Sequence, residues 1–215
     1  MASGLQKVPW THPGIARILA ALPVDTPSLL DVGCGTGIIG ALCRVYRDVD
    51  RLVGIDAHGP SLALCRRHAF YDLCVEASLD AGPLPFANRE FAVATAVEVI
   101  EHLTKSAGLA LLAELERVAD LVIVTTPCGF MPQGELMSNP LQRHQSGWTP
   151  ADFTRRGYTV RGVGGFGLFG RQRRFVSSAL APLTYYLPQL SELLLCTLVQ
   201  DGGGRREDGR KVRED

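Results

Sequence analysis

The feature that most constrains the fold is a glycine-rich stretch between an apolar run and an amphipathic run. The run SLLDVG (residues 28–33) is short, apolar and ended by glycine, which predicts a buried strand. Residues 36–47 have apolar side chains at helical spacing, so a helix is expected directly after the glycines. A strand that enters a helix through glycines exposes backbone N–H groups, and a ligand can touch the backbone because Cβ atoms are missing. The stretch DVGCGTG (residues 31–37) therefore predicts a ligand-binding loop.

Strand-like and helix-like segments then alternate along the chain, which predicts a mostly parallel sheet with helices on both faces. At 215 residues the chain suits one α/β domain. The last apolar run fits a helix as well as a strand, and we favour the strand. Expected helices cover 15–22, 36–47, 61–70, 106–119 and a short piece of 149–157, and expected strands cover 28–33, 51–56, 72–78, 91–98, 121–127, 158–164 and 193–202.

Composition and charge exclude several classes of protein. The 22 basic and 22 acidic groups balance, so the whole chain has no electrostatic preference for nucleic acid, which makes a nucleic-acid partner an unfavoured hypothesis. Prolines and a glutamate interrupt the most apolar stretch (179–199), which argues against a transmembrane span. The six cysteines form no C-x-x-C pair and the N-terminus has no apolar signal-peptide run, so we expect reduced thiols and a cytoplasmic location.

Two ligands fit the glycine-rich loop. Gly35, Gly37 and Gly40 also satisfy G-x-G-x-x-G, the fingerprint of dinucleotide binding, which would suit a nicotinamide-dependent oxidoreductase. Asp31 argues against that ligand, because a carboxylate at the strand end repels a pyrophosphate and attracts a cationic amino acid moiety. A non-catalytic module that binds a cofactor is a third hypothesis.

The acid, one apolar residue and G-x-G-x-G of DVGCGTG resemble the motif of the class I S-adenosylmethionine-dependent methyltransferases, here of the methyltransferase type 11-like family. The resemblance extends over roughly residues 28–165. It implies a Rossmann-like α/β fold in a single domain, with a central, mostly parallel, seven-stranded sheet, and it implies S-adenosyl-L-methionine as cofactor. The enzyme would transfer a methyl group to an oxygen, nitrogen or carbon atom of a small-molecule or lipid-like acceptor.

The resemblance also assigns a cofactor site. Asp56 ends the second strand, 19 residues after Gly37, where a carboxylate can accept both ribose hydroxyls. Asp80 would receive the exocyclic amine of adenine, and Leu79 or Ala81 would flank the ring. Ala92 stands where the family often has aspartate. The full predicted cofactor-binding set is Asp31, Gly33, Cys34, Gly35, Gly37, Asp56, Ala57, Leu79, Asp80, Ala81 and Glu98.

Candidate catalytic residues follow the fourth strand. His102, beside Glu101, is the first candidate for a general base, because imidazole titrates near neutral pH, and His144 is the second. The alternative is that neither histidine is catalytic and that both only form hydrogen bonds with the loop backbone. Glu98, Glu101 and His102 form E-x-x-E-H, which resembles the metal-binding stretch of small-RNA 3′-terminal and quinone O-methyltransferases. Gly147 stands where the RNA enzymes have a further histidine, so we assign no metal ligand and leave metal binding open.

The predicted domain covers residues 1–200, with an N-terminal helical extension (1–27) and an active-site loop (127–148), and a disordered polar tail covers 201–215. Residues 141–175 carry seven arginines and one acid, about +6 in charge, which is typical of a solvated face or of a platform for an anionic acceptor. Trp10, His12 and Trp148 would roof the pocket or pack in the core. No motif identifies the acceptor or the oligomeric state.

Overall fold

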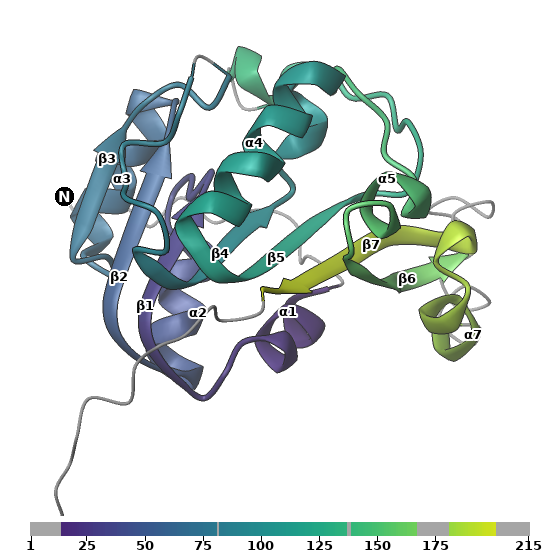
Figure 1. Ribbon diagram of the computed structural model, residues 1–215. Helices are drawn as coiled ribbons and strands as arrows, with labels where there is room; N and C mark the ends of the chain where they lie inside the picture. The colour runs from purple at the N-terminus through teal and green to yellow at the C-terminus, as the bar shows by residue number, and fades with distance from the viewer. Residues whose placement is uncertain (1–13, 81, 137–138, 167–180, 201–215) are drawn as a thin grey trace, which may run out of the picture.

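The computed structural model describes residues 14–80, 82–136, 139–166 and 181–200 (Figure 1). Its centre is a seven-stranded sheet in the order β3-β2-β1-β4-β5-β7-β6. All neighbouring pairs are parallel except those of β7, which runs antiparallel to both β5 and β6. The predicted mostly parallel, seven-stranded sheet is therefore confirmed. The strands are β1 (Asp25–Val32), β2 (Asp48–Asp56), β3 (Leu73–Glu76), β4 (Phe91–Val97), β5 (Ala119–Pro127), β6 (Thr159–Phe166) and β7 (Ser191–Val199).

Helices cover both faces of the sheet (Figure 1). Side chains of α1, α2 and α3 pack with one set of strand residues, whereas α4 and α5 pack with the other, so there are two separate hydrophobic clusters. Successive strand residues enter different clusters, as the pleat requires: Leu29 belongs to the first and Leu30 to the second. The helices are α1 (Ile15–Ala21), α2 (Ile38–Tyr46), α3 (Gly59–His68), α4 (Lys105–Val118), α5 (Pro150–Thr154) and α7 (Ala181–Tyr186), with 3-10 turns η1 (Ile100–His102), η2 (Pro140–Gln142) and η5 (Pro188–Leu190).

The strand order places the predicted site residues at one edge of the sheet. Because β1 lies between β2 and β4, the carboxyl ends of these three strands are neighbours, and Asp31 is in register with Gly54 on one side and Thr95 on the other. Ligands of open α/β sheets bind at this edge. The predicted 127–148 loop connects β5 to α5, and its two ends pair with each other through the Gly129 N–H and the Trp148 carbonyl at 2.6 Å.

Trp148 packs in the core and does not roof a pocket. Its side chain is fully buried, its ring lies against Phe153, and Gly108 of α4 leaves the space that the ring occupies. The Lys105 ammonium lies 3.6 Å from the ring centroid. Trp10 and His12 lie outside the described residues, as do the predicted tail and Ala81.

None of the helices within the described ranges has both the length and the apolar character needed to cross a membrane. All six cysteines lie in described residues and are free thiols, as predicted. The assignment to the cytoplasm stays a prediction.

The arginine-rich segment is largely engaged where the structure describes it. Arg156 forms a two-bond ion pair with Glu116, Arg143 lies 3.5 Å from Glu135, and Arg161 lies over the Tyr185 ring. These contacts favour a structural role for the three side chains. The last three arginines of the segment, at 171, 173 and 174, lie outside the described residues.

Candidate active site

The glycine-rich loop between β1 and α2 has the backbone conformation that the motif requires. Gly33, Gly35 and Gly37 have φ values of 73°, 53° and 97°, in the left-handed region that other residues rarely enter. At Gly33 a Cβ atom would also lie 2.4 Å from Val99 Cγ2. Glycine is therefore favoured at all three positions by backbone conformation, and at Gly33 by close packing as well.

Four N–H groups of this loop do not face outward as predicted, because they are satisfied within the protein. The Gly33 and Cys34 N–H groups donate to the Ile55 carbonyl, Gly37 donates to Cys34, and Gly35 donates to the Asp56 Oδ2 atom at 2.8 Å. A phosphate-binding loop must keep such donors for its ligand. The loop therefore offers a bare glycine surface, which suits a nucleoside without phosphates better than a dinucleotide.

Asp56 lies at the end of β2 and is held in a fixed position. Its Oδ2 atom accepts from the Gly35 N–H and its Oδ1 atom accepts from the His58 N–H at 2.7 Å. The carboxylate is half-buried beside the loop, and Ala57 follows it at the same edge. This placement agrees with the role predicted for Asp56, and each carboxylate oxygen keeps a lone pair for a hydroxyl.

Asp31 is buried, with 1% of its surface exposed. Its Oδ2 atom accepts from the Tyr71 hydroxyl at 2.6 Å, and its Oδ1 atom accepts from the Thr95 hydroxyl at 2.8 Å. Burial raises the pKa of Asp31 to about 6, although both hydroxyl bonds oppose that rise. These two hydroxyl partners were not predicted from the sequence, and direct contact with a cationic ligand stays a prediction.

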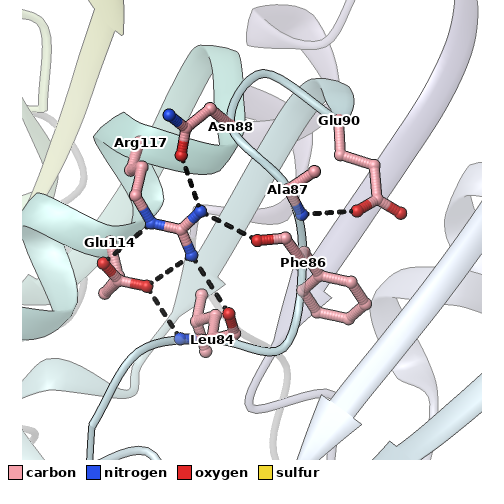
Figure 2. A network of polar contacts seen from close by, with 7 residues as sticks. All are labelled: Leu84, Phe86, Ala87, Asn88, Glu90, Glu114 and Arg117. Atoms are coloured by element: carbon pink, nitrogen blue, oxygen red, sulfur yellow. Dashed lines mark hydrogen bonds and ion pairs between the residues drawn. The ribbon is translucent and has the colours of Figure 1, made fainter.

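The predicted adenine segment lies against α4. Leu79 and Asp80 line a pocket of about 320 Å³, with Gly82, Pro83 and the small residues Ala107, Ala110 and Ala113 of the helix. Below it the 84–88 segment is fixed by Arg117, which donates to the Leu84 and Phe86 carbonyls, to Asn88 and to Glu114 (Figure 2). This role of Arg117 was not predicted, because Leu84, Phe86 and Asn88 lie about 30 residues away in sequence.

Glu98 directly follows β4 and lies in the left-handed region, with φ at 55°. A strained non-glycine residue of this kind is found mostly where the surrounding structure imposes it, often at functional sites. Its N–H donates to the Thr125 carbonyl, and its Oε1 atom accepts from the Thr125 hydroxyl at 2.9 Å. The carboxylate is thereby directed across the ends of β4 and β5.

The structure brings together the three predicted catalytic residues. One ligand-type atom from each of Glu101, His102 and His144 lies within 4.8 Å of the others, and the two imidazole rings are 4.9 Å apart. Residues 145 and 146 hold the loop here, because both N–H groups donate to the Glu101 carbonyl. These bonds bring together two histidines that are 42 residues apart in sequence.

The Glu101 carboxylate is buried, with only 2% exposed. Its Oε2 atom accepts from the Thr126 hydroxyl at 3.0 Å, whereas its Oε1 atom has no hydrogen-bond partner within the described residues. Burial, with Glu98 nearby, raises the pKa of Glu101 well above its usual range. Thr126 was not predicted, because a threonine inside a strand has no sequence signal of its own.

Both histidines have their Nδ1 atom beside a backbone carbonyl. His144 Nδ1 lies 2.6 Å from the Met131 carbonyl oxygen, and His102 Nδ1 lies 3.4 Å from the Arg143 carbonyl oxygen. A carbonyl accepts only from a protonated nitrogen, so each neutral ring carries its proton on Nδ1 and a lone pair on Nε2. Burial and the neighbouring His144 lower the pKa of His102, which keeps its ring neutral.

The comparisons with known proteins concern the domain and the fold. Residues 29–120 match the family model of the methyltransferase domain. These residues of the chain form a methyltransferase domain. The predicted enzyme class is thereby confirmed. No curated protein sequence matches this methyltransferase.

Solved structures share the fold at low identity. A chain in the complex between the Haloferax volcanii Trm112 methyltransferase activator and the putative methyltransferase has a TM-score of 0.62 at 15% identity, covering 90% of this chain and 91% of that one. A Mesorhizobium loti S-adenosylmethionine-dependent methyltransferase has a TM-score of 0.57 at 16% identity, and the match covers 86% of this chain and 97% of that one. DhpI in complex with SAH has a TM-score of 0.57 at 13% identity, and the match covers 88% of this chain and 83% of that one.

Proposed function

We propose that this methyltransferase transfers the methyl group of S-adenosylmethionine to a small-molecule or lipid-like acceptor, and that the accepting atom is a hydroxyl oxygen. The observation that carries the proposal is the convergence of Glu101, His102 and His144 at the sheet edge where the glycine-rich loop and Asp56 lie. Methyl transfer to a hydroxyl needs a base for the hydroxyl proton, whereas transfer to a thioether or a neutral amine does not.

The cofactor half of the site comprises the loop 31–37, residues 56–58 and residues 79–80. Asp56 would accept the ribose hydroxyls, and the pocket between Leu79, Asp80 and α4 would receive the adenine. The internally satisfied N–H groups support a ligand without phosphates. DhpI, which shares the fold, was solved with SAH and in a SAM-HEP complex. When bound, the cofactor supplies a sulfonium methyl group that a nucleophile displaces in line.

The acceptor half comprises Glu101, His102, His144 and the loop 128–148. The Nε2 atom of either histidine would take the acceptor proton, because Nδ1 lies beside a backbone carbonyl and Nε2 then carries the lone pair. Glu101, held by Thr126, would stabilise the imidazolium that results. The loop also carries exposed apolar side chains, which would contact an apolar part of the acceptor: Phe130, Met131, Leu136 and Leu141.

The direct test is methyl transfer from cofactor labelled in the methyl group. The protein is incubated separately with a lipid extract and with a polar small-molecule extract, and the labelled products are separated. We expect an O-methylated product, predominantly from the lipid extract. Label that appears only on nitrogen or carbon, or no labelled product from either extract, would contradict the proposal.

A divalent metal at the same cluster is a second candidate, as in quinone-type O-methyltransferases. The donor set fits: Glu101 Oε1 is buried without a partner, and both imidazoles offer Nε2 while Nδ1 is bound to a carbonyl. These three residues would hold the ion, which would polarise the acceptor hydroxyl. Titration of Mn²⁺ into the cofactor-free protein tests this, because binding must then be lost in Glu101→Ala. An RNA 3′-terminal acceptor is less favoured, since Gly147 offers no second histidine.

The oxidoreductase alternative is not supported. The family match is to a methyltransferase domain, and Gly40, which completed the dinucleotide fingerprint, is required for another reason. Its Cβ atom would lie 2.4 Å from the Tyr71 ring.

A further inference from the structure

Tyr71 lies in the turn between α3 and β3, and its hydroxyl joins the two elements that flank the glycine-rich loop. It donates to Asp31 Oδ2 at 2.6 Å and accepts from the Gly40 N–H at 2.9 Å. Asp31 belongs to β1 before the loop, and Gly40 belongs to the first turn of α2 after it. One buried hydroxyl therefore fixes the distance between the start and the end of the loop.

The first turn of α2 needs such a partner. The first N–H groups of a helix have no partner within the helix, and the N-cap side chain usually supplies one. Here the N-cap is Gly37, which has no side chain. Its positive φ value of 97° requires glycine, so the cap must come from elsewhere. The Tyr71 hydroxyl provides it from 31 residues away.

The Tyr71 ring also accounts for two glycines outside the core motif. A Cβ atom on Gly40 would lie 2.4 Å from the ring, and one on Gly54 of β2 would lie 3.0 Å from it. A Cβ atom on Gly37 would lie 3.3 Å from the same ring. The ring therefore fills the space beneath the loop, and it packs there because larger residues are absent at these positions.

We propose that Tyr71 is a positioning residue of the cofactor site, which presets the glycine-rich loop by capping α2 and anchoring it to β1. The proposal depends on the proposed function only in that the loop binds S-adenosylmethionine. Tyr71 touches no ligand in this account and acts through Gly40 and Asp31. Asp31 keeps its second hydroxyl donor, Thr95 of β4.

The test compares Tyr71→Phe with two matched variants. Thr95→Val removes the other donor to Asp31 and leaves Gly40 capped, and Tyr158→Phe removes a buried hydroxyl on the opposite face of the sheet. We expect Tyr71→Phe to weaken S-adenosylhomocysteine binding about tenfold, the effect of one buried hydrogen bond. We expect a smaller loss for Thr95→Val and none for Tyr158→Phe, with the KM for the acceptor unchanged.

A second readout is specific to the cap. In the wild-type protein without cofactor, the Gly40 amide should exchange slowly with deuterium, and Tyr71→Phe should accelerate that exchange while amides of β1 stay protected. Wild-type affinity in Tyr71→Phe, or an equal loss in Thr95→Val, would overturn the proposal. If Tyr71→Phe does not fold, the wild-type protein still tests the proposal, because rapid exchange of its Gly40 amide would overturn it. Absence of S-adenosylhomocysteine binding to the wild type would contradict the proposed function instead.

Discussion

The cofactor half and the acceptor half of the site are built from different kinds of contact. The cofactor half depends on backbone conformation: three glycines at positive φ, N–H groups satisfied internally, and Asp56 fixed by two N–H donors. The acceptor half depends on side chains that a long loop brings to η1, with Glu101 Oε1 left without a partner. Residues that shape backbone permit few alternatives, whereas loop side chains can change with the acceptor. Substitutions in the two halves should therefore have separable effects.

The largest effect is expected at Gly33. Gly33→Ala combines a φ of 73° with a Cβ atom 2.4 Å from Val99, which should cost about 3 kcal/mol in the free energy of unfolding and remove cofactor binding. Gly35→Ala is the matched control, because its φ is 53° but no atom lies within 4 Å of the new Cβ. It should cost about 1 kcal/mol. Urea unfolding measures both, and equal costs would show that contact with Val99 does not matter.

His144→Ala should separate the halves most clearly. Loss of a general base lowers kcat by about a hundredfold or more, and the affinity for S-adenosylhomocysteine should stay within about twofold. Glu135→Ala is a control from the same loop, since that exposed side chain pairs with Arg143 at 3.5 Å. Steady-state kinetics measures kcat, and calorimetry measures the affinity for S-adenosylhomocysteine. A large loss of cofactor affinity in His144→Ala would mean that the halves are one unit.

A pH effect is expected from the cofactor half. The pKa of Asp31 is about 6 in the folded protein against an ordinary value of 3.8, so the folded state binds the proton more tightly. Stability from this group is complete below about pH 4 and declines as the pH rises to about 6, by about 2–3 kcal/mol. Asp31→Asn cannot titrate. Its free energy of unfolding relative to wild type should increase between pH 4.5 and pH 7, and a constant difference across that range would refute the shifted pKa.

The smallest effect is expected at Arg117. Arg117→Ala releases the 84–88 segment below the pocket lined by Leu79 and Asp80, and should weaken S-adenosylhomocysteine binding about threefold. Arg89→Ala breaks an exposed ion pair with Asp120 and should leave the affinity unchanged. Calorimetric titration of S-adenosylhomocysteine into both variants measures the two affinities. Equal affinities for the two would remove the adenine segment from the cofactor half.

Local patterns predicted much of the fold and the cofactor loop. The alternation of apolar runs gave the order of the elements, and the need for positive φ at alternate positions follows from glycine itself. The end of β2 was placed correctly, so Asp56 could be predicted. What the sequence could not show is how polar groups are satisfied: the loop N–H groups were expected to face a ligand, yet they donate to Ile55, Cys34 and Asp56.

The residues that were missed act across long separations in sequence. Tyr71 and Thr95 bind Asp31 from 40 and 64 residues away, and Thr126 binds Glu101 from a neighbouring strand. None lies in a motif, and the pairing exists only once the strand order is known. Gly40 and Gly54 were the available signal, because glycines in neighbouring elements leave space for a bulky side chain to pack against them. The meeting of His102 with His144 was likewise hidden by the loop between them.

The most direct test of the two-part site is calorimetric titration of S-adenosylhomocysteine into wild type, Asp56→Ala and His144→Ala. We predict micromolar or tighter binding to wild type, a loss of at least about tenfold in Asp56→Ala, since the ribose hydroxyls lose their acceptor, and no change in His144→Ala. Undetectable binding to wild type, or an intact affinity in Asp56→Ala, would contradict the assignment of the cofactor half.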